Sequence, residues 1–315
     1  MQKILITGGS GFLGKNLALK LKNDYEVILT SRNNKQNFIV GKYTDCRVIP
    51  MDVSNIESVR DVFIEVKPDI VIHGAATKFV DLCETYPMES IDVNIVGSQN
   101  VARVAMEQGV DTVIGISTDK ACPPIRNIYG LTKATMEKLF CLVDGKTKTK
   151  FACVRYGNVA WSTGSVLPIW KEQHGKTGVI GTTGPEMRRF FFTVDHAVEL
   201  VVNAINNIDL IHGQILSREM KSAKMEDILN VWIDNFGGSW ERIKGRPGER
   251  VDEYLVGETE LEYTQKLIIN NINHFLISPN KKSENPLSEV VHSNNSVRLT
   301  DEEILEIINA KPDIL

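Results

Sequence analysis

The chain has 315 residues, 42% of them hydrophobic and 24% charged, which is the composition of an ordinary globular protein with a large core. Its formal net charge of −4 argues against a general nucleic-acid-binding protein, because such proteins carry basic surfaces that neutralise phosphates. No apolar run reaches the roughly 18 residues of a membrane span. The first residues have a strand pattern rather than that of a signal peptide.

The cysteines and histidines favour a reduced protein without a metal site. The five cysteines are widely spaced and form no CxxC pair, and the six histidines form no HExxH or other zinc-ligand pattern. We therefore expect free thiols in a cytoplasmic protein that binds neither a metal nor a membrane.

Strand-like and helix-like segments alternate through the first half of the chain. Apolar runs predict strands at residues 3–7, 25–30, 47–50, 70–73, 112–117 and 151–155, and helical spacing predicts helices at 12–22, 56–66, 87–108 and 129–143. This alternation predicts an α/β fold, a Rossmann-type doubly wound parallel sheet with ligands beyond the carboxyl ends of its strands. After residue 160 the pattern loosens into a smaller C-terminal region, with residues 194–204 expected to return to the main sheet.

A glycine motif directly follows the first predicted strand. Gly8, Gly11 and Gly14 stand three residues apart, and a helical pattern begins at Phe12. Residues without a Cβ let the backbone approach a pyrophosphate, and the helix N-terminus offers free N–H groups and a positive dipole to that anion. The motif therefore predicts a dinucleotide-binding turn.

The end of the second predicted strand favours NADP over NAD. An NAD-binding protein has a carboxylate there that accepts hydrogen bonds from the ribose, whereas this chain has Ser31 and Arg32. A guanidinium can pair with the 2′-phosphate of NADP through two hydrogen bonds. Asp52, after the third strand, is a candidate acceptor for the adenine amino group, and a role in capping a nearby helix stays equally open.

Tyr129 and Lys133 are four residues apart, so they lie on one face of a predicted helix. An unperturbed tyrosine has a pKa near 10, which is too high for a general base at neutral pH. A neighbouring ammonium group and the positive charge of nicotinamide favour the phenolate, so we expect the pKa of Tyr129 to be lowered. Because the pair follows a dinucleotide motif and a strand that ends in Ser117 and Thr118, it predicts a catalytic centre.

Several motifs together resemble the extended short-chain dehydrogenases/reductases, namely TGGSGFLG, STDKA, YGLTK and RYGNV. The run STDKACPPIRNIYGLTKATMEKLF is similar to the UDP-N-acetylglucosamine 4,6-dehydratases that open pseudaminic-acid and related bacterial polysaccharide pathways. The resemblance covers roughly residues 1–260 and continues in GSV at 164–166, MRRF at 187–190 and GRPGER at 245–250. The chain after about residue 265 matches no motif that we can name.

The resemblance implies a lyase with tightly held NADP. A dehydratase needs an acid and a base beyond the groups that move the hydride, and Asp119 and Lys120 match the family's pair. Tyr129, tuned by Lys133 and aided by Thr118, is expected to accept the C4 hydroxyl proton while hydride passes to NADP. A neutral Lys120 then removes the C5 proton, a protonated Asp119 protonates the departing C6 hydroxyl, and hydride returns to C6. The product is a UDP-4-keto-6-deoxy-N-acetylhexosamine, and inversion at C5 stays open.

The resemblance also implies the division of labour along the chain. Residues 1–160 and about 190–216 are expected to bind NADP, while about 161–189 and 217–315 bind the UDP-sugar. We expect a homo-oligomer, dimeric or higher, formed through the helices at 87–108 and 129–143. Two positions depart from the family pattern: Cys122, where relatives commonly have a small residue, and Arg188, where they often have Thr. The expected cofactor contacts are Gly8, Ser10, Gly11, Phe12, Leu13, Gly14, Ser31, Arg32, Asp52, Val53, Ala75, Ala76, Lys78, Asn94, Tyr129 and Lys133, and the expected substrate contacts are Lys78, Asn158, Arg189, Arg246 and Glu249.

Two alternatives remain open at this point. One is a nucleotide-sugar 4-epimerase or 4-reductase that uses only Thr118, Tyr129 and Lys133. The other is a non-catalytic NADP-binding regulator on the same fold, against which the intact Tyr129 and Lys133 pair argues.

Overall fold

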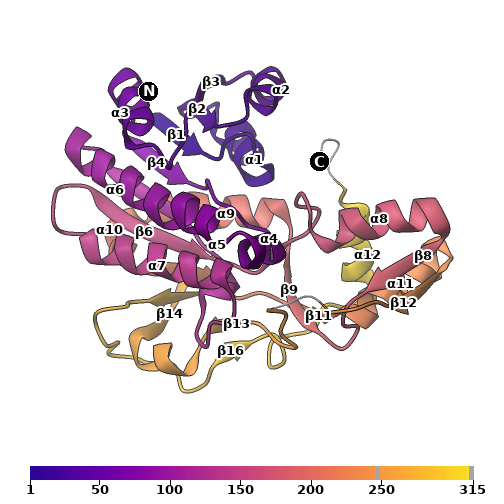
Figure 1. Cartoon of the computed structure of the whole chain (residues 1–315). Helices are drawn as coiled ribbons and strands as arrows, with labels where there is room; N and C mark the ends of the chain where they lie inside the picture. Colours follow the sequence, from indigo (N-terminus) through magenta and orange to yellow (C-terminus); the bar gives the residue numbers. More distant parts are fainter. Residues whose placement is uncertain (246–247, 312–315) are drawn as a thin grey trace.

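A nine-stranded sheet forms the centre of the protein, in the order β14-β15-β10-β6-β5-β4-β1-β2-β3 (Figure 1). The structure is a computed structural model that describes residues 1–245 and 248–311. The strands from β10 to β3 are parallel, and the β14–β15 hairpin adds two antiparallel strands beside β10. The strands are β1 (Lys3–Thr7), β2 (Glu26–Ser31), β3 (Arg47–Pro50), β4 (Ile70–His73), β5 (Thr112–Ile116), β6 (Lys150–Arg155), β10 (Ile215–Arg218), β14 (Thr264–Ile269) and β15 (Ile272–Ile277).

Helices cover both faces of this sheet because alternate strand residues point to opposite sides. Ile4 and Ile6 of β1 join one core with α1 and α9, while Leu5 joins a second core with α3, α6 and α7. The helices of this part are α1 (Phe12–Leu21), α2 (Asn34–Thr44), α3 (Ile56–Val66), α4 (Val80–Thr85), α5 (Pro87–Ile91), α6 (Gly97–Gln108), α7 (Ile128–Val143), α9 (Val194–Asn206) and α10 (Ile208–Ile211), with a short 3₁₀ turn η2 (Asp119–Ala121) after β5.

A smaller region lies beside the sheet, at the right of Figure 1, around a third core. Helices α8 (Val166–Thr177), α11 (Met225–Phe236) and α12 (Asp301–Asn309) pack there on Trp161, Trp170 and Trp232, which are nearly fully buried. Its strands are β7 (Asn158–Val159), β9 (Arg188–Phe192) and β11 (Ser222–Lys224) in one sheet, and β8 (Val179–Thr182) with β12 (Ser239–Arg242). A further pair, β13 (Tyr254–Val256) with β16 (Val291–His292), packs instead against the two cores of the central sheet, and η3 (Glu258–Tyr263) follows β13.

The predicted fold class is confirmed, and the structure adds three features to the expected elements. Helix α2 was not predicted, since its apolar stripe is weak and Phe38 and Ile39 are exposed. The helix expected at 87–108 consists of α5, one π-helical turn (Asp92–Val96) and α6. Residues 264–277, which the sequence assigned to the sugar-binding region, extend the central sheet, while residues 194–204 return to it as helix α9.

Asn94, within the π-helical turn, connects two neighbouring segments. Asn94 uses its whole side-chain amide: its oxygen accepts from the backbone N–H of Thr77 at 2.8 Å, and its nitrogen donates to the carbonyl of Thr77 and the hydroxyl of Thr132, both at 3.0 Å. This side chain thereby ties the segment after β4 to α7.

Among the residues that the structure describes, no helix combines the length and the apolar character that a membrane crossing requires.

A buried ion cluster holds three elements together behind the carboxyl end of β6. Arg155, which is 1% exposed, donates to Glu137 of α7 at 2.9 and 2.7 Å and to Glu260 of η3 at 2.8 Å twice. Burial by itself lowers the pKa of Arg155, but the two carboxylates outweigh it and raise that pKa well above its ordinary value. The guanidinium therefore stays charged and neutralises two buried carboxylates.

We predict that Arg155→Met lowers the free energy of unfolding by about 3–5 kcal/mol, because it leaves two carboxylates buried without a counter-charge. Urea denaturation followed by circular dichroism measures this loss. Arg60→Met is the matched control, since Arg60 also pairs with two glutamates, Glu57 and Glu107, but at the surface. The control should leave the midpoint near that of the wild type; equal losses in both variants would contradict the assignment.

Candidate active site

The turn between β1 and α1 brings backbone very close to the segment after β4. Gly8 has φ +69°, and a Cβ there would lie 2.8 Å from the backbone nitrogen of Ala75. A Cβ on Gly14 would lie 2.6 Å from the Cα of Gly9. Gly11 is the N-cap of α1 and has no side chain to occupy the first helical N–H groups. The turn therefore presents unobstructed donors at a positive helix end, which suits a pyrophosphate.

A cavity of about 720 Å³ opens over this turn and the carboxyl ends of β1, β4 and β5. Of the predicted site residues, those that line it are Gly8, Ser10, Gly11, Phe12, Leu13, Gly14, Ala75, Ala76, Lys78, Thr118, Lys120, Tyr129, Lys133 and Asn158. The predicted fingerprint and four of the five predicted catalytic residues therefore face one space, large enough for an extended ligand; the fifth, Asp119, is fully buried and lies behind Lys120.

The residues expected to select NADP lie at the end of β2. Ser31 accepts a hydrogen bond from the Ser10 hydroxyl at 2.8 Å. Arg32 is half exposed, and its guanidinium lies 3.6 Å from Glu89 of α5, which lines the cavity. Sequence reasoning found no carboxylate in this position because Glu89 comes from an element far along the chain.

Three further expected cofactor contacts are not among the described residues that line this cavity. Asp52 accepts from the backbone N–H and hydroxyl of Ser54, so it caps a turn, while the N-cap of α3 is Asn55. Val53 is buried against α6. Asn94 does not line the cavity but hydrogen-bonds to Thr77, which does. Their predicted contacts with a cofactor stay predictions.

Tyr129 and Lys133 face the cavity from the first turns of α7, with Thr118 opposite. Burial raises the pKa of Tyr129 to about 12, although the charge of Lys120 and the hydroxyl of Thr118 act in the other direction. Burial has the opposite effect on the lysine and lowers the pKa of Lys133 to about 8. The side chains of the protein thus do not by themselves produce the lowered tyrosine pKa expected from the sequence, because desolvation outweighs the nearby positive charge.

Asp119 and Lys120 form an ion pair at the start of η2. Asp119 is fully buried and accepts from Lys120 Nζ at 3.0 Å and from the Thr118 hydroxyl at 3.0 Å. Burial, the largest influence, lowers the pKa of Lys120, but the charges of Asp119 and Glu253 outweigh it and hold that pKa above its ordinary value. The raised pKa favours the charged form of the Lys120 amine.

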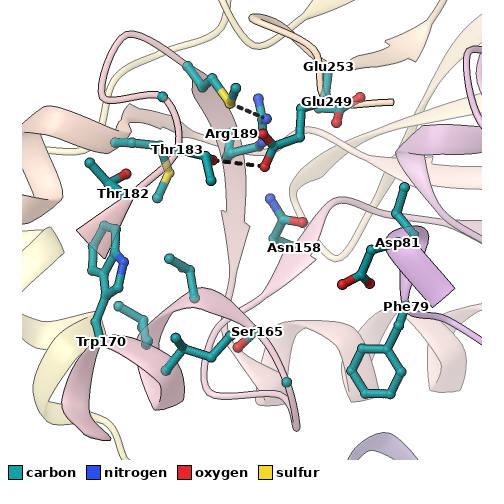
Figure 2. Close-up of a pocket in the computed structure, with 18 of the residues that line it drawn as sticks. Phe79, Asp81, Asn158, Ser165, Trp170, Thr182, Thr183, Arg189, Glu249 and Glu253 are labelled. Carbon is teal, nitrogen blue, oxygen red and sulfur yellow. Dashed lines mark hydrogen bonds between the residues drawn. The ribbon is translucent and has the colours of Figure 1, made fainter. Parts of the chain in front are cut away.

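A second cavity, of about 280 Å³, continues from the first into the smaller region (Figure 2). Asn158 of β7 and Arg189 of β9 point into it, and Glu249 faces them and accepts from the Thr183 hydroxyl at 2.9 Å. Lys78, Lys120 and Asn158 line both cavities. Four of the five predicted substrate contacts therefore meet here, and the fifth, Arg246, lies outside the described residues.

Arg189 is fastened to the loop that follows Gly248. Its guanidinium donates to the carbonyls of Arg250 at 2.8 Å and Val251 at 3.2 Å, and it contacts the sulfur of Met187 at 3.0 Å. Arg188 pairs instead with Asp252 at 3.4 Å. Both neighbouring arginines thus hold the loop, and Arg189 also lines the cavity.

Sequence reasoning missed Glu253, which lines the second cavity with its side chain 4% exposed and its carboxylate 3.6 Å from Lys120 Nζ. No periodic or motif signal identifies it, because its proximity to Lys120 depends on the return of the chain after β12.

Within the part of the chain that the structure describes, no cluster of three or more His, Cys, Asp or Glu side chains is arranged to hold a metal ion.

Comparison with known proteins places the chain in a family. The family model described as polysaccharide biosynthesis protein matches residues 4–272. The chain belongs to this family. It is 33% identical to a protein of Campylobacter jejuni named UDP-N-acetylglucosamine 4,6-dehydratase (inverting), over 98% of this chain and 97% of that protein. These findings confirm the resemblance inferred from the motifs.

Other relatives carry other names. A Rickettsia bellii protein named UDP-glucose 4-epimerase is 34% identical over 97% of this chain and 94% of its own length. Among solved structures, Pen from Bacillus thuringiensis superposes with a TM-score of 0.90 at 28% identity, covering 98% of this chain and 97% of that one. The whole architecture, including the β14–β15 hairpin, is therefore shared with a solved relative.

We predict that Gly14→Ala abolishes dinucleotide binding, or weakens it at least tenfold, because the added methyl group collides with the backbone of Gly9 and displaces the turn. Titration of NADP and NAD into the protein, followed by fluorescence or calorimetry, measures the loss. Gly175→Ala in α8 is the control, since a Cβ there meets nothing within 4 Å. A Gly14→Ala protein that binds as the wild type does would contradict the assigned turn.

Proposed function

We propose that the protein is an NADP-dependent UDP-N-acetylglucosamine 4,6-dehydratase. The observation that carries this proposal is the Asp119–Lys120 ion pair, with its 3.0 Å contact, at the place where the two cavities join. A reductase or an epimerase needs only groups that serve hydride transfer. An acid and a base within one hydrogen bond of each other, beside the tyrosine, meet the further requirement of removing water.

The residues divide the chemistry between two steps. Tyr129 takes the proton from the C4 hydroxyl, and Thr118 and Lys133 orient that end of the cavity. A bound nicotinamide dinucleotide supplies the acceptor and later the donor of the hydride. Once C4 is a ketone, the C5 proton is acidic enough for the neutral amine of Lys120 to remove, and Asp119 protonates the C6 hydroxyl as it leaves.

The substrate class follows from the charges of the second cavity. Arg189 supplies positive charge for a diphosphate, and Asn158 and Glu249 supply hydrogen-bonding groups. Arg246, the other predicted basic contact, lies outside the described residues. The cavity also contains an apolar wall, formed by Leu167, Trp170 and other side chains, opposite these polar groups. We infer that the diphosphate lies near Arg189 and that the sugar extends toward Lys120.

The names of the relatives support this proposal and define its alternative. The Campylobacter jejuni relative is named as the dehydratase, whereas the Rickettsia bellii relative, with similar identity and coverage, is named UDP-glucose 4-epimerase. A 4-epimerase is therefore the second candidate. The two differ in whether Lys120 is needed for turnover.

We also propose a homo-oligomer formed through α5 to α7. Several large apolar side chains are exposed on or near these helices, including Tyr86, Met88 and Leu131. Pairing of two copies would remove such exposed apolar side chains from water.

We predict that Lys120→Met lowers the rate of dehydration by about 10²–10⁴-fold, the range expected for loss of a general base, while C4 oxidation persists. An NMR time course with UDP-N-acetylglucosamine in D2O, without added reductant, measures a new C6 methyl signal and deuterium at C5. Lys146→Met, in an exposed loop, is the control. Undiminished formation of the methyl signal in Lys120→Met would favour the epimerase or reductase.

We predict that the protein binds NADP more tightly than NAD and that Arg32→Ala removes this preference, weakening NADP roughly tenfold or more because one charge-assisted contact is lost. Glu89→Gln should strengthen NADP binding, since it removes a negative charge that competes for Arg32. Calorimetric titration of each cofactor into each variant decides the matter. Tighter NAD binding that is indifferent to Arg32→Ala would refute the proposal for NADP.

A further inference from the structure

Glu253 occupies a fixed position at the wall of the second cavity. It is 3% exposed and lies just before β13. Its backbone N–H donates to the hydroxyl of Ser293 at 3.1 Å, and its carbonyl accepts from the backbone N–H of Ser293 at 2.9 Å. Because Ser293 is itself fully buried, the two hydrogen bonds hold the start of the Glu253 side chain in one place.

The carboxylate of Glu253 is buried without full compensation. Its Oε1 lies 3.6 Å from Lys120 Nζ, and its Oε2 lies 3.8 Å from Arg250 Nη1, a distance too long for a hydrogen bond. Among the described residues, Glu253 Oε2 and both terminal nitrogens of Arg250 have no hydrogen-bond partner. A buried charge that is so poorly satisfied costs stability, so an arrangement of this kind calls for a functional explanation.

Glu253 acts on a small set of charged groups. Lys120 is the nearest, and Asp119 lies on the other side of that amine, at 3.0 Å from it. The titratable and charged groups that face Lys120 and Glu253 from the surrounding elements are Asp119 on η2, Tyr129 on α7, Arg189 on β9, and Glu249 and Arg250 on the loop before β13. Glu253 is therefore the second carboxylate, after Asp119, that pairs with the Lys120 amine.

The proposed dehydration requires one proton on the Asp119–Lys120 pair. Asp119 gives that proton to the departing hydroxyl, and the neutral Lys120 takes one from C5. With two protons, the amine is not a base; with none, the carboxylate is not an acid. A negative charge beside the pair favours its protonated states, so it extends the one-proton state to higher pH.

We propose that Glu253 is a positioning residue that directs Lys120 toward the sugar and keeps one proton on the Asp119–Lys120 pair throughout the working pH range. This inference rests on the proposed dehydratase function. It assigns a role to a residue that touches Lys120 rather than the reacting atoms. It also explains why an incompletely satisfied carboxylate is held in place by Ser293.

The test is the pH dependence of elimination in Glu253→Gln. Glutamine keeps the size and hydrogen bonding of the side chain but removes the charge, so a merely structural role predicts an unchanged profile. We expect the pH at which elimination declines on the alkaline side to fall by roughly 1–2 units, the size of effect that a charge at this distance exerts. Single-turnover appearance of reduced cofactor at each pH reports C4 oxidation, and C6 methyl formation divided by that rate isolates elimination.

Two further variants make the result decisive. Glu258→Gln is the control: it removes a negative charge from an exposed side chain of η3, so its profile should match the wild type. Glu253→Asp keeps the charge, so it should lower the rate but leave the alkaline decline within about half a unit of the wild type. If Glu253→Gln does not fold, Glu253→Asp tests the inference by itself. In that case, an alkaline decline that falls in Glu253→Asp by the roughly 1–2 units expected for loss of the charge would overturn the inference.

The outcomes separate the two proposals. If the wild type oxidises C4 but forms no C6 methyl signal, the dehydratase function is wrong, and this inference is overturned with it. If the wild type dehydrates and Glu253→Gln shows the wild-type alkaline decline, only the role of Glu253 is wrong. A raised KM with an unshifted profile also overturns the inference, because it indicates a substrate contact.

Discussion

The parallel pairing of β1, β4, β5 and β6 is the constraint on which the site depends. Because these strands run in one direction, their carboxyl ends and the turns that follow them meet at one edge of the sheet. The glycine turn follows β1, Ala75 and Lys78 follow β4, and Thr118 to Lys120 follow β5. Residues more than 100 positions apart in the chain thus line one cavity.

Burial works against the chemistry at several points of this site. It raises the pKa of Tyr129 and lowers that of Lys133, and it opposes the charge on Lys120. Paired charges, rather than solvent, stabilise the charged forms of these buried cations. Asp119 and Glu253 pair with Lys120, and Glu137 and Glu260 pair with Arg155. The first set surrounds an amine that lines the cavity, and the second fastens α7 and η3 to the end of β6.

The sequence predicted the parts of the site that depend on local spacing. The glycine turn, the Tyr129 and Lys133 pair on one helical face, and the adjacent Asp119 and Lys120 are all set within a few residues. The structure brings all of them to one cavity except Asp119, which is buried behind Lys120. Glu89, Glu253 and the β14–β15 hairpin were missed because each takes its place from chain returns over long separations. The direction of the Tyr129 pKa also escaped prediction, since desolvation depends on everything that surrounds the ring.

The clasp between Arg189 and the carbonyls of Arg250 and Val251 has a consequence for ligand binding. The guanidinium belongs at once to the rigid strand β9 and to the loop that leads to Glu253. An anion that draws Arg189 toward the cavity therefore also changes the hydrogen bonds that Arg189 makes to the loop. The free energy of anion binding and the free energy of ordering the loop are thus linked. By reciprocity, whatever steadies the loop strengthens the hold on the anion by the same factor.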